Sequence, residues 1–274
     1  MDIWLFLQAI IMGIIEGITE FLPISSTGHL IVAGEMMDFW TLEKRNTFAV
    51  VIQMGAIAAV IYEYWHKLWG AFWGALRREP EGLRLAIGLL AASIPIVIVG
   101  FTIGSWVKEA LFNNVTVAIG LIVGGLIILW VEKHPQPITA QEIEQISIKQ
   151  SIQIGLLQCL SLIPGTSRAG ATIVGGMVVG LSRKNATEFS FFLGIPVIIG
   201  AALLDLYESR GVLQSQQDLA VLAVGTLVSF VSALILIRVL VRYVAKHDLS
   251  VFAWYRIISG VVILVFVWTG WTLW

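Results

Sequence analysis

Two short polar segments, residues 16–29 and 158–172, carry most of the side chains of this chain that could do chemistry. Each leads from apolar sequence through a proline into hydroxyl residues and glycines, and then back into apolar sequence. Carboxylates, hydroxyls, a histidine and an arginine are costly inside hydrocarbon, so in a strongly apolar chain they indicate function. We therefore place the candidate site in these two segments.

Two carboxylates begin the first segment. Glu16 and Glu20 are four residues apart, which puts them on one face of a helix. Carboxylates this close repel each other, so either one of them binds a proton or a cation lies between them. Because Mg²⁺ and Ca²⁺ prefer oxygen ligands, the pair predicts a site for one of these divalent cations. The alternative is a charged helix face that only touches water near the membrane surface.

Hydroxyl residues and a histidine follow the carboxylates. Ser26 lies three residues before His29, and a serine needs a neighbouring base to act as a nucleophile. Thr27 lies between them and could donate a hydrogen bond to a phosphate. Hydroxyls beside a glycine also commonly cap a helix, which is the structural alternative. Because a carboxylate pair precedes them, we expect catalysis or phosphate binding here.

The second segment is suited to binding an anion. Gly165 frees the backbone to present N–H groups, and the helix expected after it points its positively polarised N-terminus inward. Arg168 is always charged and can bind phosphate through two hydrogen bonds. Further donors are the hydroxyls of Thr166, Ser167 and Thr172. A salt bridge from Arg168 to Glu16 or Glu20 is the structural alternative, and both roles could hold in the empty protein.

The composition places this chemistry in a membrane. The chain is 58% hydrophobic and 13% charged, with a mean hydropathy of +0.88. These values are typical of an all-α polytopic membrane protein surrounded by membrane lipid. A single cysteine, Cys159, excludes an intramolecular disulfide and a thiol-rich metal site. We expect no nucleic-acid partner, because the chain has no basic tract and no aromatic binding platform.

We predict six transmembrane helices plus two re-entrant helical hairpins. After His29 only Leu30–Met37 is apolar, and eight helical residues rise about 12 Å against a hydrocarbon core of about 30 Å. Around the second segment, Ile152–Ile163 and Ala169–Leu181 would each rise less than about 20 Å. Neither polar segment can then cross, and the six crossings are expected at residues 47–64, 85–104, 114–131, 186–206, 218–239 and 251–272. The main competing model has seven crossings, with residues 3–22 as a full span.

The two halves of the chain correspond at an offset of about 141 residues. Matching pairs are Gly13 and Gly155, Glu16 and Gln158, Pro23 and Pro164, Gly28 and Gly170, and Phe48 and Phe189. Three crossings separate the copies, so the second would be inverted relative to the first, and the hairpins would meet near the midplane. We therefore predict a single integral-membrane domain, residues 1–274, with inverted-topology pseudo-repeats at approximately 1–110 and 145–274.

The distribution of Lys and Arg predicts the orientation. With six crossings, one side receives eleven of these residues and the other receives only Lys44, Arg45, Lys108 and Arg210. Cytoplasmic loops carry the excess of positive charge, so both termini are expected outside the cytoplasm. Arg256, near the start of the last crossing, is expected to extend to the membrane interface.

These motifs resemble the signatures of a known family. Glu16-x-x-x-Glu20, the run Pro23–His29 and the run Pro164–Arg168 are similar to those of the bacterial undecaprenyl-diphosphate phosphatases of the bacitracin-resistance type. The resemblance covers nearly the whole chain and includes Gln53 and Glu188.

The resemblance implies hydrolysis of the terminal phosphate of undecaprenyl diphosphate, which recycles the lipid carrier for peptidoglycan synthesis. It also implies metal dependence, location in the bacterial inner (plasma) membrane, and a site facing the periplasm or cell exterior. The second motif departs from the family, which usually has a serine at the position of Ala169. A hydroxyl at that position is therefore not essential in this chain.

Two mechanisms and a rival function remain open at this stage. Ser26 could attack the terminal phosphorus with His29 as base, or metal-activated water could attack directly. In both cases Glu16 and Glu20 would hold the cation and Arg168 would neutralise the phosphoryl group. The rival function is transport, because inverted repeats with broken helices also build transporters and a flippase of a phosphorylated polyprenyl lipid would need a similar site. The sequence also leaves a homodimer open.

Overall fold

Helices make up most of the described part of the chain. The computed structural model describes residues 2–209, 211–212 and 215–270, apart from the side chain of Lys108. Within these ranges no strand forms, and the β-pairing there is an isolated bridge between Ala140 and Leu181. The prediction of an all-α protein is confirmed.

Among the described residues, six helices are long and apolar enough to cross a membrane. They are α3 (Leu42–Glu63), α5 (Pro80–Leu111), α6 (Asn114–Lys133), α9 (Arg183–Glu208), α10 (Gln216–Val244) and α11 (Ser250–Trp268). Each contains most of one predicted crossing, so the six crossings are confirmed as helices and the chain is a multi-pass membrane protein. Arg210 and residues 271 and 272 of the last predicted crossing lie outside the described residues.

The two polar segments join short helices. In the first half, α1 (Ile3–Thr19) and α2 (Ser26–Met36) flank the turn. In the second half, α7 (Ile148–Gln158) and the 3₁₀ helix η2 (Cys159–Leu162) precede the turn, and α8 (Arg168–Val178) follows it. At 1.5 Å per residue, the 11 residues of α2, α7 and α8 rise about 17 Å, which is too short to cross. Re-entrant placement in a bilayer stays a prediction.

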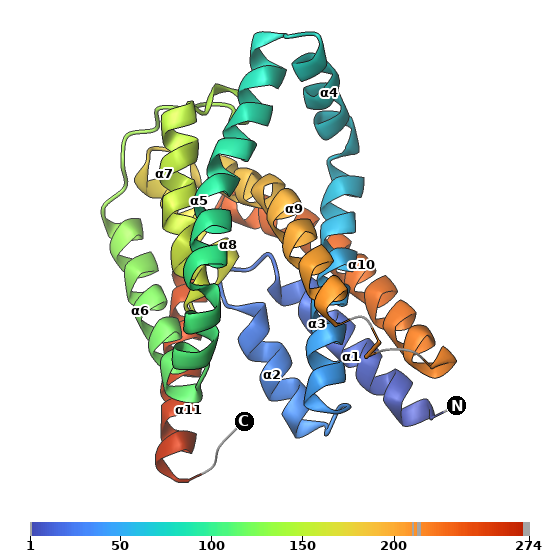
Figure 1. Ribbon diagram of the computed structural model, residues 1–274. Helices are drawn as coiled ribbons and strands as arrows, with labels where there is room; N and C mark the ends of the chain where they lie inside the picture. The colour runs from blue at the N-terminus through green and yellow to red at the C-terminus, as the bar shows by residue number, and fades with distance from the viewer. Residues whose placement is uncertain (1, 210, 213–214, 271–274) are drawn as a thin grey trace.

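The remaining helical pieces lie at one end of the molecule. They are α4 (Trp65–Leu76) and the 3₁₀ helix η1 (Ile143–Gln145). In Figure 1, α4 and the beginning of α5 project at the top of the molecule, while the first residues of the chain lie at the opposite end.

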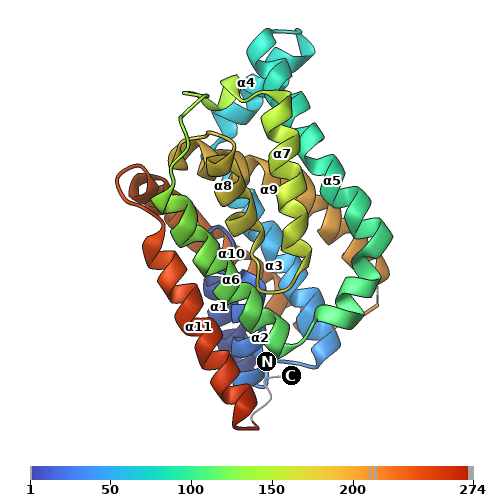
Figure 2. The same cartoon turned by 90° about the vertical axis from the view of Figure 1, so that its left-hand side faces the viewer.

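The two halves interlock. Helix α1 packs along α10, α7 packs along α5, and α6 pairs with α11 (Figures 1 and 2). Each short first helix is therefore held against a long helix of the other half. An inverted repeat would produce this reciprocal pairing, and the repeat remains our prediction.

A buried aromatic layer lies beside the end of α1. Phe21 and Phe191 are fully buried, and their ring centroids are 5.1 Å apart in an edge-to-face arrangement. Phe21 directly follows Glu20 in the chain, and Phe191 directly follows Ser190 on α9. Packing of the two rings therefore brings the end of α1 against α9, where the candidate site forms.

Candidate functional site

The two helices after the polar turns begin in the same way. Ser25 precedes α2 and Ser167 precedes α8, and both serines have φ of 72°. This left-handed region is unfavourable for a serine, and such strain clusters at functional sites. The hydroxyl of Ser167 accepts a hydrogen bond from the N–H of Gly170 at 3.0 Å, so it caps α8. Ser26 and Arg168 consequently occupy equivalent places as the first residues of their helices.

Glu20 joins the two turns. Its Oε2 accepts a 2.6 Å hydrogen bond from the hydroxyl of Ser26, and its Oε1 accepts a 3.0 Å hydrogen bond from Nη2 of Arg168. Glu20 and Ser26 are buried. Three predicted site residues, taken from positions up to 148 apart in the chain, therefore form one acid–serine–arginine cluster. The predicted salt bridge of Arg168 is made to Glu20.

Helix α9 holds Arg168 in place. Nη1 of Arg168 donates to the carbonyl of Ser190 at 2.8 Å. Thr172 donates to the carbonyl of Arg168 at 2.9 Å and shares a 2.6 Å hydrogen bond with the hydroxyl of Ser190. Thr172 is fully buried and does not line the cavity described next. The structure therefore places this predicted substrate-binding residue behind Arg168, where it supports the arginine.

A polar cavity of about 160 Å³ opens beside the cluster. Its polar lining comes from both turns and the neighbouring α3 and η2: Glu20, Ser25, Ser26, Thr27, Gln53, Ser161, Gly165, Ser167 and Arg168. Gly165 has φ of +88°, and a Cβ there would lie 2.2 Å from the carbonyl oxygen of Val117, so only glycine fits. Thr166 is not part of the lining, and its carbonyl accepts a hydrogen bond from Arg256.

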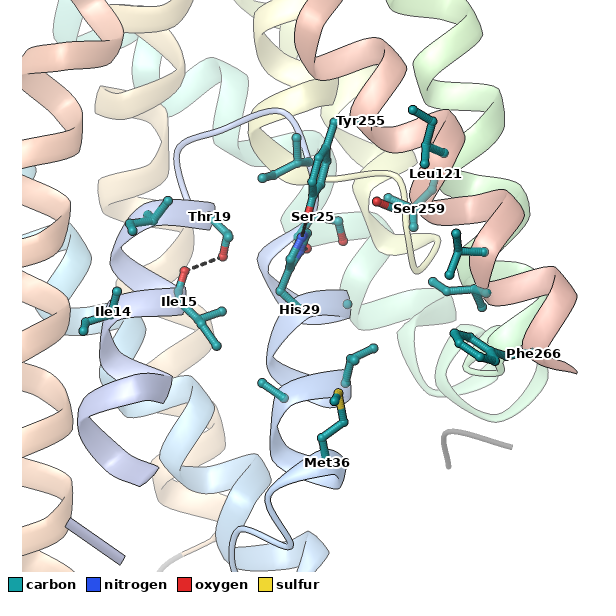
Figure 3. Close-up of a pocket in the computed structure, with 18 residues that line it drawn as sticks. Ile14, Ile15, Thr19, Ser25, His29, Met36, Leu121, Tyr255, Ser259 and Phe266 are labelled. Atoms are coloured by element: carbon teal, nitrogen blue, oxygen red, sulfur yellow. Dashed lines mark hydrogen bonds between the residues drawn. The ribbon is translucent and has the colours of Figure 1, made fainter. Parts of the chain in front are cut away.

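The ring of His29 is hydrogen-bonded to Ser25 and Tyr255. Its Nδ1 donates to the carbonyl of Ser25 at 2.7 Å, and its Nε2 then accepts a 2.5 Å hydrogen bond from the hydroxyl of Tyr255. The two rings are stacked, with centroids 5.6 Å apart, and Figure 3 shows them side by side. The hydrogen bond expected between Ser26 and His29 is not formed among the described residues, and the partner of Ser26 is Glu20.

An apolar groove of about 630 Å³ lies on the other side of the first turn. Figure 3 shows its walls, which come from α1, α2, α6 and α11, with Ile14, Met36, Leu121 and Phe266 among the lining residues. Ser25 lines both this groove and the polar cavity. A molecule with a charged head and a long apolar tail could therefore occupy both spaces at once.

Glu16 supplies oxygen atoms without partners. Its carboxylate is fully buried, neither oxygen has a hydrogen-bond partner, and it lies beside the carboxylate of Glu20. No group of three or more His, Cys, Asp or Glu residues forms a metal site within the described ranges. Two carboxylates nevertheless fit a Mg²⁺ or Ca²⁺ ion whose other ligands are substrate oxygens and water. Gln158, the predicted counterpart of Glu16, is likewise fully buried, with its side-chain amide unpartnered.

Sequence reasoning missed several residues around the site. Tyr255 gave no signal, because a tyrosine is ordinary in a membrane helix. Ser190 lies within the run that resembles the family, but it was given no role of its own. The prediction that Arg256 extends to the membrane interface is wrong, because its side chain points inward and is 1% exposed. Its position within an apolar crossing was a usable signal, because a charge there marks a functional position. Glu188 pairs with Lys67 at 3.4 Å and with Lys184 at 3.9 Å, and it does not line the cavity.

The fold and the site define a class of multi-pass α-helical membrane proteins with a buried acid–serine–arginine cluster between two helical turns. A family model described as "Bacitracin resistance protein BacA" matches residues 9–262, and the chain belongs to this family.

Curated relatives match along the whole chain. "Undecaprenyl-diphosphatase 1" of Acinetobacter baylyi is 68% identical over 274 residues, covering 100% of both chains. "Undecaprenyl-diphosphatase" of Psychrobacter cryohalolentis is 57% identical, covering 98% of this chain and 97% of the relative. "Undecaprenyl-diphosphatase 2" of Rhodospirillum rubrum is 50% identical, covering 100% of this chain and 99% of the relative.

Proposed function

We propose that the chain hydrolyses undecaprenyl diphosphate to undecaprenyl phosphate and inorganic phosphate, and so recycles the lipid carrier for peptidoglycan synthesis. Membership of the BacA family and the names of its relatives support this substrate. The single observation that carries the chemistry is the shared carboxylate of Glu20, which binds the hydroxyl of Ser26 through one oxygen and Arg168 through the other.

The first step of the mechanism follows from the 2.6 Å hydrogen bond between Ser26 and Glu20. Ser26 Oγ bonds to the terminal phosphorus while the bond from that phosphorus to the bridging oxygen breaks, and the Ser26 proton moves to Glu20. Undecaprenyl phosphate leaves with the bridging oxygen. Glu20 passes its proton to the departing lipid phosphate. Water then bonds to the phosphorus of the phosphoserine and gives a proton to Glu20, while the bond from that phosphorus to Ser26 Oγ breaks. Ser26 Oγ takes the proton back from Glu20, and inorganic phosphate is released. Direct attack by water remains the alternative.

Arg168 and the two helix N-termini supply positive charge. Arg168 is bound to Glu20, and a phosphoryl group in the cavity would offer it a second anionic partner. The beginnings of α2 and α8 both face this cavity, since Ser26, Thr27, Ser167 and Arg168 all line it. Helix N-termini bind phosphate through free N–H groups and the helix dipole. We expect each N-terminus to hold one phosphoryl group of the diphosphate.

Glu16 and Glu20 would hold a divalent cation. The unpartnered oxygens of buried Glu16, next to Glu20, support this assignment. When bound, such a cation neutralises charge on the diphosphate oxygens. It would also relieve the repulsion between the two carboxylates.

The apolar groove would receive the polyprenyl chain. It meets the polar cavity at Ser25, and its lining is almost entirely aliphatic and aromatic apart from Thr19, His29, Tyr255 and two serines. We further propose that the site faces the periplasm or cell exterior from the inner membrane, as the distribution of Lys and Arg indicates. A homodimer stays a prediction.

The deciding experiment measures phosphate release by the pure protein in detergent. With undecaprenyl diphosphate and Mg²⁺ or Ca²⁺, we expect inorganic phosphate at a rate that a chelator abolishes. A transporter or flippase would release no phosphate under these conditions, because moving the lipid breaks no bond between its phosphoryl groups. Release that is unchanged by the chelator would remove the cation from the proposal and leave hydrolysis in place.

A further inference from the structure

Arg256 of α11 binds the backbone of both polar turns. Its Nη1 donates to the carbonyl of Pro23 in the first turn at 2.8 Å and to the carbonyl of Thr166 in the second turn at 2.9 Å. Its Nη2 donates to the carbonyl of Gly165 at 3.0 Å. The same side chain therefore contacts two turns that lie more than a hundred residues apart in the sequence.

Helix α6 completes the binding of this guanidinium. Nη2 also donates to the carbonyl of Gly120 at 3.0 Å, and Nε donates to the carbonyl of Leu121 at 3.2 Å. A guanidinium has five N–H donors, and Arg256 makes five hydrogen bonds, all to backbone carbonyls. Four elements, which are the two turns, α6 and α11, thus meet at one buried side chain.

The positive charge of Arg256 has no carboxylate partner among the described residues. A buried charge without an ion pair is strongly unfavourable unless hydrogen bonds compensate it. Carbonyl dipoles from all three bound segments provide that compensation here. Moving either turn away would leave part of the charge uncompensated, so the guanidinium resists separation of the turns.

The guanidinium of Arg256 lies directly against the backbone of α6 at Gly124. A Cβ at Gly124 would lie 2.0 Å from Nη2 of Arg256. Any side chain at this position would therefore displace the guanidinium. Gly124 offers a way to disturb Arg256 without changing its charge.

Arg256 also polarises a peptide group whose N–H belongs to Ser167, a residue that lines the cavity. The carbonyl of Thr166 belongs to the same peptide group as the N–H of Ser167, and Ser167 lines the polar cavity while Arg256 does not. A cation at the carbonyl end polarises the peptide and strengthens its N–H as a donor. The N–H groups at the beginning of α8 are the ones that we expect to bind phosphate.

We propose that Arg256 is a positioning residue for phosphoryl transfer: it keeps the two turns in register so that Ser26 and Arg168 meet at Glu20. The inference rests on the proposed hydrolysis, because the register of the turns matters only if both serve one reaction. Arg256 touches neither the cavity nor the reacting atoms, and it acts through the turns that it binds.

Kinetics of three variants test the proposal. Arg256→Met removes the guanidinium, Arg256→Lys keeps the charge but replaces the fork by a single ammonium, and Gly124→Ala displaces an intact arginine. We expect kcat to fall about 100-fold in all three while KM changes only a few-fold, since small misplacement of reacting groups acts mainly on the reaction step. Arg238→Met is the matched control, because Arg238 is half exposed on α10 and pairs with Glu63. It should retain native kcat.

Hydrogen exchange separates positioning from a general loss of stability. In Arg256→Lys and Gly124→Ala we expect faster amide exchange at residues 22–28 and 163–170, with exchange in α3 and α10 unchanged. Native kcat in Arg256→Lys, or exchange that accelerates equally in all helices, would overturn the proposal. If the native protein released no phosphate, the proposed hydrolysis would fail, while local exchange at both turns would still report whether Arg256 joins them.

Discussion

Ser26 and Arg168 bind opposite oxygens of one carboxylate, that of Glu20, at 2.6 Å and 3.0 Å. Each is the first residue of a helix whose preceding serine has φ of 72°. The proposed nucleophile, Ser26, and the arginine proposed to bind phosphate, Arg168, are therefore held in a fixed relation by a single acid. This arrangement explains how two segments far apart in the sequence can serve one phosphoryl group.

Replacing the hydroxyl of Ser26 should abolish turnover. We expect Ser26→Ala to lower kcat by at least about 1,000-fold, because loss of a nucleophile leaves only the contribution of binding and charge stabilisation. Rapid quench with terminally labelled lipid should trap label on Ser26 in the native protein. Thr102→Ala is the control, since the exposed hydroxyl of Thr102 bonds only to carbonyls of its own helix. Ordinary turnover in Ser26→Ala would favour direct attack by water.

The Glu20–Arg168 pair should show strong coupling in stability. Removing one partner of a buried pair leaves an uncompensated charge, so Glu20→Gln alone and Arg168→Gln alone should each destabilise the protein by about 3 kcal/mol. The double variant should be more stable than either single variant, because no charge is left unpaired. Thermal unfolding in detergent measures all three. Additive losses would show that the two charges do not interact, although all three variants should be inactive.

His29 and Tyr255 should behave as one unit. Because their hydrogen bond faces the groove, we expect His29→Gln and Tyr255→Phe to reduce kcat/KM by a similar amount, about 10-fold or less, and the double variant to be no worse than either. Loss of a general base would instead lower kcat/KM by about 100-fold to 10,000-fold. Steady-state kinetics of the three variants decide between these roles. A loss of that size in His29→Gln alone would restore His29 as the base.

Glu16 should make the thermal stability of the protein depend on the divalent cation. With both oxygens buried and unpartnered beside Glu20, Glu16→Gln should raise the Tm of the metal-free protein, because it removes the repulsion. The native protein should gain stability when Mg²⁺ or Ca²⁺ is added, and the variant should not. Thermal unfolding with and without each ion is the measurement. An equal gain in both proteins would place the cation elsewhere.

Much of the fold could be predicted because hydropathy and helical rise are local properties. Charge-free runs such as residues 114–131 predicted crossings that the structure contains, and the apolar stretches beside the polar turns were too short to cross. The residues of the acid–serine–arginine cluster were also predicted, because Glu20, Ser26 and Arg168 are conspicuous in an apolar chain. Thr166 and Thr172 were expected to bind substrate on the same grounds, but neither lines the cavity.

The sequence by itself determined which helices form and which polar residues the apolar chain carries, because periodicity and composition act over neighbouring residues. Only the tertiary structure decided the partners of those residues. Ser26 pairs with Glu20 while His29 pairs with Tyr255, 226 positions away, and Arg256 points to the turns and not to the interface. Such pairings depend on how helices from the two halves pack and rotate against one another, which no local pattern encodes.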